Sequence, residues 1–269
     1  MYKLLNHTVM KRYISVVLFA LSVVCVGAQK LVTVDRNTGH IAYGDGESLT
    51  YTVRYGILTG GKGYFSVNDT IINGVRANHV VCKGVTSGLP DVFFKVRDTY
   101  ESFIDPTTQL PVKAVRDISE GKYRYYDEIV YDHKKNKVHT IKKGTEDVPM
   151  QTLDIVSAFY HARNNTFDDN LDVGDTIMYT TYFAGEVFPL RIKYRGRECV
   201  KTKFGNIMCH KFSPITEVGR AFKTEDDMQV WISCDGNRLP IRIQFDMWAG
   251  SFVCELTNYK GLMYPIKTI

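Results

Sequence analysis

The stretch "SLTYTVRYGILTGGKGYFSVN", residues 48–68, decides between two very different folds. Its first half carries an apolar side chain at every second position from Leu49 to Ile57, with polar residues or glycine between them. That period of two is typical of a half-buried antiparallel strand. The second half, from Gly56 to Lys62, fits the nucleotide-binding pattern G-x-x-x-x-G-K, but Gly63 stands where Ser or Thr would hold Mg²⁺.

A phosphate-binding loop needs a helix directly after its glycines, because the N–H groups of the helix N-terminus hold the phosphate. Here the glycines lead into a second alternating segment that contains Phe65 and Val67. We therefore interpret Gly60, Gly61 and Gly63 as residues that supply positive φ and a bulge in a β-hairpin. Nucleotide binding is not expected.

The rest of the chain repeats the strand pattern, with Asn73-Gly74 as a type I′ hairpin signal. The segment "TLDIVSAFYHARN" differs, because its apolar residues recur at helical spacing behind Thr152, a candidate cap. A weaker, short helix is expected in "PDVFFKV", residues 90–96. We predict an all-β fold: an antiparallel, strongly curved sheet that forms a barrel or half-barrel, with one main helix at about 152–164 on or inside it. Two β-sandwiches are the alternative.

The N-terminus has the succession of features that marks an export signal. Lys11 and Arg12 precede the apolar run "YISVVLFALSVVCVGA", and small residues lead to a cleavage site between Ala28 and Gln29. We expect residues 1–28 to be a signal peptide and the mature protein to be soluble and periplasmic. An uncleaved membrane anchor is the alternative, and translation from Met10 instead of Met1 gives a more typical signal.

The predicted mature chain, residues 29–269, is nearly neutral. Its formal charge is +2 instead of +5, because three basic residues and no acidic residue leave with the signal peptide. A nucleic-acid partner is therefore not expected. No repeat or linker divides the chain, so we predict a single β-rich exported domain, with two β halves joined near 145–172 as the alternative.

Motifs for catalysis or metal binding do not rise above background. The histidines are scattered without an H-E-x-x-H pattern, and no G-x-S-x-G elbow is present. "DDNLDVGD" resembles a calcium loop, but its glycine, Gly174, comes one residue late and Tyr179 stands at the position of the bidentate Glu. We predict no catalytic, metal or cofactor site, and no cofactor.

Five cysteines remain after removal of the signal peptide, so at least one of them has no partner within the chain. Buried free thiols and a single disulfide are equally compatible with their spacing. The sequence leaves the pairing open among these five residues: Cys82, Cys199, Cys209, Cys234 and Cys254.

The segment "VWISCDGNRLPIRIQFDMWAGSFVCEL", residues 230–256, resembles the C-terminal signature of the exported bacterial domain-of-unknown-function family 3108. The resemblance extends over most of residues 45–260 and implies an exported β protein without assigning an activity. The matching residues are Trp231, Ser233, Asp235, Arg238, Pro240, Arg242, Gly250 and Ser251.

The physical properties of the signature residues favour structural roles. We expect Trp231 to be a core anchor, a tight turn to begin at Asp235, and Pro240 to stand near a strand start. For Arg238 and Arg242, pairing with carboxylates is favoured over ligand binding.

For function, we expect a non-enzymatic binding or envelope-maintenance protein whose concave sheet holds an apolar or amphipathic partner. The expected partner is a lipid or other apolar ligand, or an envelope protein, because Tyr and Phe are abundant at alternate strand positions. The alternative is a hydrolase that acts on envelope glycan or lipid, with carboxylates brought together only by the fold. The sequence leans against an enzyme without excluding one.

Export predicts a specific new N-terminus. Protein recovered from the periplasm is expected to begin at Gln29 when its N-terminus is sequenced, because signal peptidase cleaves after small residues such as Ala28. Recovery of the chain from the membrane fraction with Met1 or Met10 retained would contradict this prediction.

Overall fold

The computed structural model describes residues 31–32, 39–164, 171–215, 227–247 and 250–269. In this part of the chain, fifteen strands form one sheet and two helices accompany it. The predicted cleavage site, Ala28-Gln29, lies outside the described residues.

The first half of the sheet is an antiparallel meander in which each strand pairs with the next one in the chain. A short helix, α2 (Leu89–Phe93), interrupts it where the weaker helix was expected. Its strands are β2 (Ser48–Tyr55), β3 (Leu58–Ile72), β4 (Val75–Thr86), β5 (Arg97–Ile104), β6 (Pro111–Glu120), β7 (Tyr123–Asp132), β8 (Lys137–Thr140) and β9 (Gly144–Asp147).

The second half follows helix α3 (Ile155–Asn164) and is a meander of the same kind. The two halves are joined because β15 pairs with β2, with Cys254 opposite Val53. The outer strand β1 (Leu31–Val32) runs parallel to β10. The strands are β10 (Thr176–Phe183), β11 (Glu186–Thr202), β12 (Gly205–Pro214), β13 (Met228–Ser233), β14 (Pro240–Met247) and β15 (Gly250–Lys260).

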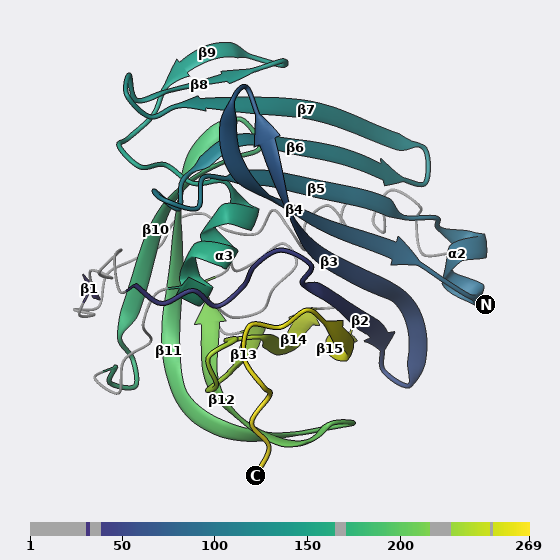
Figure 1. Ribbon diagram of the computed structural model, residues 1–269. Coiled ribbons are helices and arrows are strands. Elements are labelled where there is room, and N and C mark those ends of the chain that lie inside the picture. Colours follow the sequence, from purple (N-terminus) through teal and green to yellow (C-terminus); the bar gives the residue numbers. More distant parts are fainter. Residues whose placement is uncertain (1–30, 33–38, 165–170, 216–226, 248–249) are drawn as a thin grey trace.

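The sheet curves into an arch, and α3 lies in its hollow (Figure 1). It is not closed, because in the described residues no strand pairing joins β9 to the β1–β10 end. The segment before α3 connects to β10 instead: the Leu153 N–H donates to the Thr180 carbonyl at 2.9 Å, and Tyr182 N–H donates to the Leu153 carbonyl at 2.7 Å. The predicted curved antiparallel half-barrel with one main helix is confirmed.

Helix α3 is buried on two sides, which fills the hollow. Val156 and Tyr160 pack against side chains of β3 to β6, and Ala158 packs against β10 to β12. The predicted cap, Thr152, is wrong. Asp154 caps the helix, since its Oδ1 accepts from the N–H groups of Val156 and Ser157 at 2.8 and 2.9 Å. Thr152 instead donates its hydroxyl to the carbonyl of Pro149.

The glycine-rich stretch lies within the β2–β3 hairpin and contains a bulge, as predicted, but the positive φ expected of Gly60, Gly61 and Gly63 is wrong. Positive φ occurs at Gly56, with φ 55°, and not at the three later glycines. Gly60 is the bulge, because Arg54 pairs with Thr59 while Val53 pairs with Gly61. At Gly61 a Cβ would lie well inside 3.0 Å of the Val85 carbonyl oxygen. Close approach of the neighbouring strand therefore explains why this position holds a glycine.

A pair of substitutions tests that explanation. Gly61→Ala is expected to lower the free energy of unfolding by about 1–3 kcal/mol, because the backbone of β4 must shift. Gly60→Ala is the control, because a Cβ added at Gly60 would lie 3.8 Å from the nearest atom, the Val53 carbonyl oxygen. The expected change in the free energy of unfolding is therefore below about 0.5 kcal/mol. Urea unfolding followed by circular dichroism measures both, and equal losses would contradict the explanation.

Candidate functional site

The C-terminal end of α3 is held by a buried ion pair. The guanidinium of Arg163 makes two parallel hydrogen bonds of 2.7 Å to the Glu47 carboxylate, and their side chains are 1% and 0% exposed. The rings of Tyr43 and Tyr160 lie 5.4 and 5.0 Å from the guanidinium. Burial lowers the pKa of Arg163, but Glu47 outweighs that effect and the net shift is upward. Arg163 is therefore fully charged.

The signature turn after β13 binds the same end of α3. The carbonyl of Asn237 accepts from Arg163 Nε and Nη2 at 3.2 and 3.1 Å. In return, Arg238 Nη1 donates to the Arg163 carbonyl at 3.0 Å. The turn itself is fixed by Asp235, whose Oδ1 accepts from the Ser233 hydroxyl and the Asn237 N–H. These contacts join the second half of the sheet to the helix.

The remaining signature residues lie in β13 to β15. Trp231 is buried, with Lys211 and Arg242 over its ring, and Arg242 forms an ion pair of 2.7 Å with Glu255. Pro240 is the first residue of β14. Gly250, with φ 130°, begins β15 against the ring of Tyr55. None of the six predicted signature residues lines the cavity described next, so we place the candidate site elsewhere.

A cavity of about 30 Å³ lies at the other end of α3. We define the seam as the side of the arch where strand pairing is interrupted. There, β5, β6 and β7 face the N-terminus of α3 and the β10–β11 turn, and the cavity lies between them. Residues that line this seam cavity include Tyr100, Arg116, Tyr125, Asp127, Asp154 and Phe183.

Arg116 is the distinctive residue of the seam cavity. Its guanidinium carbon lies 4.7 Å from the ring centre of Phe183, 5.0 Å from Tyr125 and 5.6 Å from Tyr100. Its Nε is buried and has no hydrogen-bond partner among the described residues. An unpaired buried donor is costly, and such groups are uncommon in folded proteins. Arg116 is therefore held by aromatic rings and by a hydrogen bond with Tyr100, and its Nε donor is still available.

The two aspartates in the cavity are already used by the fold. Asp154 Oδ1 caps α3, and its Oδ2 accepts from the Ser102 hydroxyl at 2.7 Å. Burial raises the pKa of Asp154. Asp127 accepts from the Tyr125 hydroxyl and the Lys142 N–H at 3.2 and 3.3 Å. Both carboxylates therefore accept bonds that hold this part of the fold together.

Sequence reasoning missed Arg116, Arg163 and Glu47. A signal existed for Arg116, because it shares one strand face with Ala114 and Ile118, which are both buried. An arginine between two apolar residues of an inward face is unusual unless it has a partner. No local pattern reveals the Arg163–Glu47 pair, since 116 residues separate its members.

Other predicted features are placed as follows. No disulfide joins the five described cysteines. No group of three His, Cys, Asp or Glu in the described residues is arranged to hold a metal ion. Part of the calcium-like loop, residues 168–170, lies outside the described residues. No helix among the residues placed by the structure has the length and apolarity needed to cross a bilayer.

These features define a class of protein: an open, curved antiparallel sheet with its single main helix fixed in the hollow. The same fold occurs in a beta-barrel-like protein of the domain of unknown function DUF1849 from Brucella abortus. The two share 11% identity at a TM-score of 0.52, over 81% of this chain and 98% of that one. The family model of the protein of unknown function DUF3108 matches residues 50–257, and the chain belongs to this family. A search of curated proteins finds no match.

The Arg163–Glu47 pair allows a quantitative test. Arg163→Met is expected to lower the free energy of unfolding by about 3–5 kcal/mol, because Glu47 is left charged and buried. Adding Glu47→Leu should recover part of that loss. Arg76→Ala is the control, since its pair with Asp69 is exposed and such pairs contribute less than about 1 kcal/mol. Urea denaturation measures all three, and similar losses for Arg163→Met and Arg76→Ala would contradict the assigned role.

Proposed function

We propose that this chain is an exported, non-enzymatic binding protein whose seam cavity takes the carboxylate head of a small amphipathic ligand. The observation that carries the proposal is Arg116: a half-buried arginine whose guanidinium contacts three aromatic rings and whose buried Nε has no partner in the described residues. Export is proposed from the sequence of residues 11–28, in which two basic residues, an apolar run and small residues follow one another.

The chemistry of Arg116 favours a carboxylate. Guanidinium donors match the spacing of two carboxylate oxygens, and charge-assisted hydrogen bonds of this kind are the strong ones. The rings of Tyr100, Tyr125 and Phe183 fix the guanidinium before any ligand arrives, so its side chain loses little conformational entropy on binding. The same rings provide an apolar wall for the first carbons of a tail.

The size of the cavity limits the ligand. About 30 Å³ is room for roughly two water molecules, comparable to a carboxylate group, whereas drug-sized ligands fill about 300–1,000 Å³. A lipid inside the arch would require α3 to leave the hollow and the Arg163–Glu47 pair to separate. We therefore place the head group at the seam and the tail outside it, instead of a whole lipid in the concave face.

Titration with a series of straight-chain carboxylates, acetate to octanoate, tests the proposal. We expect saturable chemical-shift changes in the ¹H–¹⁵N NMR spectrum at residues 114–116 and 183–185, with affinity that rises with chain length. The matching alcohols should bind at least tenfold more weakly, because they lack the charge that Arg116 recognises. A peptide with a free C-terminus, compared with its amidated form, shows whether the carboxylate comes from a peptide or from a free acid.

Arg116→Gln should weaken octanoate binding at least tenfold, and Arg116→Lys, which keeps the charge without the planar donors, should weaken it by less. Arg124→Gln is the matched control, because Arg124 is an exposed arginine of β7 whose guanidinium donates to the backbone carbonyls of Gly121 and Tyr123. Thermal unfolding confirms that each variant is folded. Equal binding of alcohols and carboxylates, or full affinity in folded Arg116→Gln, would overturn the proposal.

A further inference from the structure

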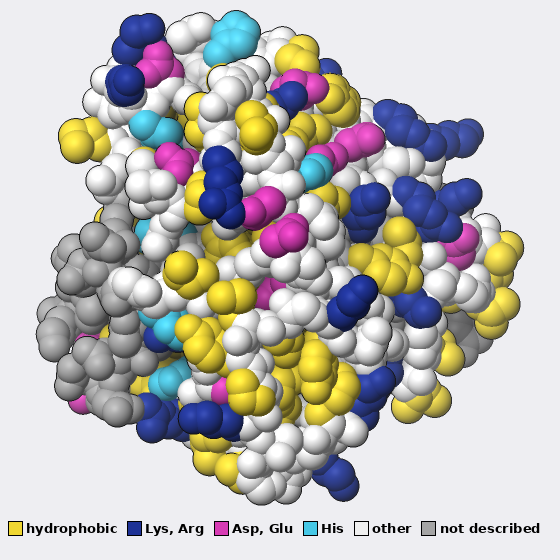
Figure 2. All heavy atoms as spheres, viewed as in Figure 1, with side chains coloured by type: hydrophobic (Ala, Val, Ile, Leu, Met, Phe, Trp, Pro, Cys, Tyr) yellow, Lys and Arg dark blue, Asp and Glu magenta, His cyan; other side chains and the backbone are white. Residues whose placement is uncertain are grey.

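One end of the sheet carries an exposed apolar surface that packing does not explain. Five large apolar side chains of α2 and the β2–β3 turn are 61–96% exposed. We call this surface the apolar tip, and it consists of Ile57, Leu58, Leu89, Val92 and Phe93. Hydrophobic side chains appear along the corresponding rim of the molecule, with Lys and Arg side chains beside them (Figure 2). Apolar residues gathered in this way mark interaction sites.

The two segments of the apolar tip are neighbours because their strands are paired. Gly61 of β3 lies opposite Thr86 of β4, and the N–H of Ser87 donates to the Gly60 carbonyl at 3.1 Å. Helix α2 begins two residues after Ser87, and it contacts β3. The β2–β3 turn and α2 therefore lie at the same end of the sheet (Figure 1).

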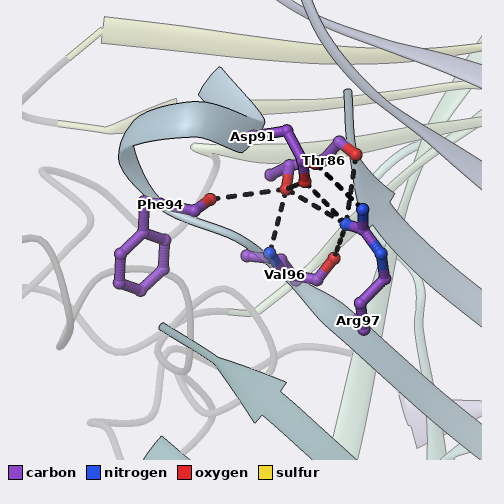
Figure 3. A network of polar contacts seen from close by, with 5 residues as sticks. All are labelled: Thr86, Asp91, Phe94, Val96 and Arg97. Carbon is purple, nitrogen blue, oxygen red and sulfur yellow. Dashed lines mark hydrogen bonds and ion pairs between the residues drawn. The ribbon is translucent and has the colours of Figure 1, made fainter. Parts of the chain in front are cut away.

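Helix α2 is held firmly with its apolar side chains outward. Thr86 donates its hydroxyl to Asp91 at 2.6 Å and accepts from the Val96 N–H, while Arg97 makes two bonds to Asp91 at 2.7 and 3.0 Å (Figure 3). The bonds from Arg97 and Thr86 hold the pKa of Asp91 at about 2. The one acidic side chain of α2 is thus paired, and it does not oppose the approach of an anionic surface.

Basic side chains flank the apolar tip. Lys62 and Lys83 are exposed on the strands that lead to it, and the exposed Lys95 lies two residues after the end of α2. The carbonyl of Lys95 accepts from the Gly121 N–H at 2.8 Å, so the exposed Lys122 of the β6–β7 turn lies beside it. Apolar side chains together with a basic margin are the combination that binds anionic membrane interfaces.

We propose that the apolar tip docks this protein onto an anionic lipid bilayer, with the five apolar side chains among the acyl chains and the lysines at the headgroups. The charge of the margin selects this occupant. A second copy of the chain would bring the same lysines against each other, and like charges in an interface are costly. This docking is independent of ligand binding at the seam cavity.

Co-sedimentation of residues 29–269 with vesicles tests the docking. The protein should bind vesicles of phosphatidylglycerol and phosphatidylcholine, bind pure phosphatidylcholine at least tenfold more weakly, and lose most of the binding in high salt. Val92→Ser/Phe93→Ser should reduce binding at least tenfold. Ile71→Ser is the matched control, because Ile71 is 74% exposed at the β3–β4 turn, away from the apolar tip.

A charge variant, Lys83→Gln/Lys95→Gln/Lys122→Gln, should weaken binding to anionic vesicles without changing the thermal unfolding temperature. Arg116→Gln should bind vesicles like the unmodified protein, which separates this result from the ligand test. No binding to anionic vesicles, or equal loss in Ile71→Ser and Val92→Ser/Phe93→Ser, would overturn the proposal. Concentration-dependent dimerisation that Val92→Ser/Phe93→Ser abolishes, without vesicle binding, would also overturn it in favour of a second copy.

Discussion

A guanidinium and a carboxylate removed from water must be satisfied by the protein, and Arg163 and Glu47 meet that requirement in the hollow of the arch. Arg163 belongs to α3, Glu47 directly precedes β2, and the carbonyls of Ala42 and Asn237 accept the further donors of the guanidinium. Segments far apart in the sequence thus all contact the guanidinium of Arg163. Because separating such a pair leaves an uncompensated buried ion, the helix cannot leave the hollow cheaply, and the filled interior is a fixed property of this fold.

The position of the helix also explains where a cavity remains. An open sheet must cover its apolar concave face, and α3 does so between β3–β6 on one side and β10–β12 on the other. Backbone pairing does not continue across the seam, where closure depends on the residues before α3 and on side-chain contacts, such as the hydroxyl of Tyr182 bonded to Glu146. Side chains fill a gap less completely than paired strands, so the cavity beside Arg116 lies at the one side that the strand ladder leaves open.

Much of this fold could be predicted from local patterns, because strand alternation and turn chemistry are local. The period of two gave the strands, and Asn73-Gly74, with φ of 52° and 77°, forms the expected turn. Predictions failed where contact with a distant segment of the chain determines the role of a residue. Gly61 is small because of the carbonyl of Val85, and Asp154 caps α3 while also bonding Ser102, 52 residues away. The seam cavity depends on residues from separate strands, and no single stretch of sequence contains it.

The orientation of α2 indicates that specific contacts, and not loose packing, leave the apolar tip exposed. Phe94 is 7% exposed and lies against Gly121, which has a φ of 54° and leaves no room for a Cβ beside the Phe94 ring. The preceding residue, Phe93, is 74% exposed. The fold therefore buries Phe94 against Gly121, whereas Phe93 lies in solvent on a helix that the ion pair of Asp91 with Arg97 attaches to the sheet. A loosely attached segment would let both rings collapse onto the sheet, because burial of apolar surface is favourable. A network that prevents this collapse is expected where the exposed side chains have a partner outside the chain.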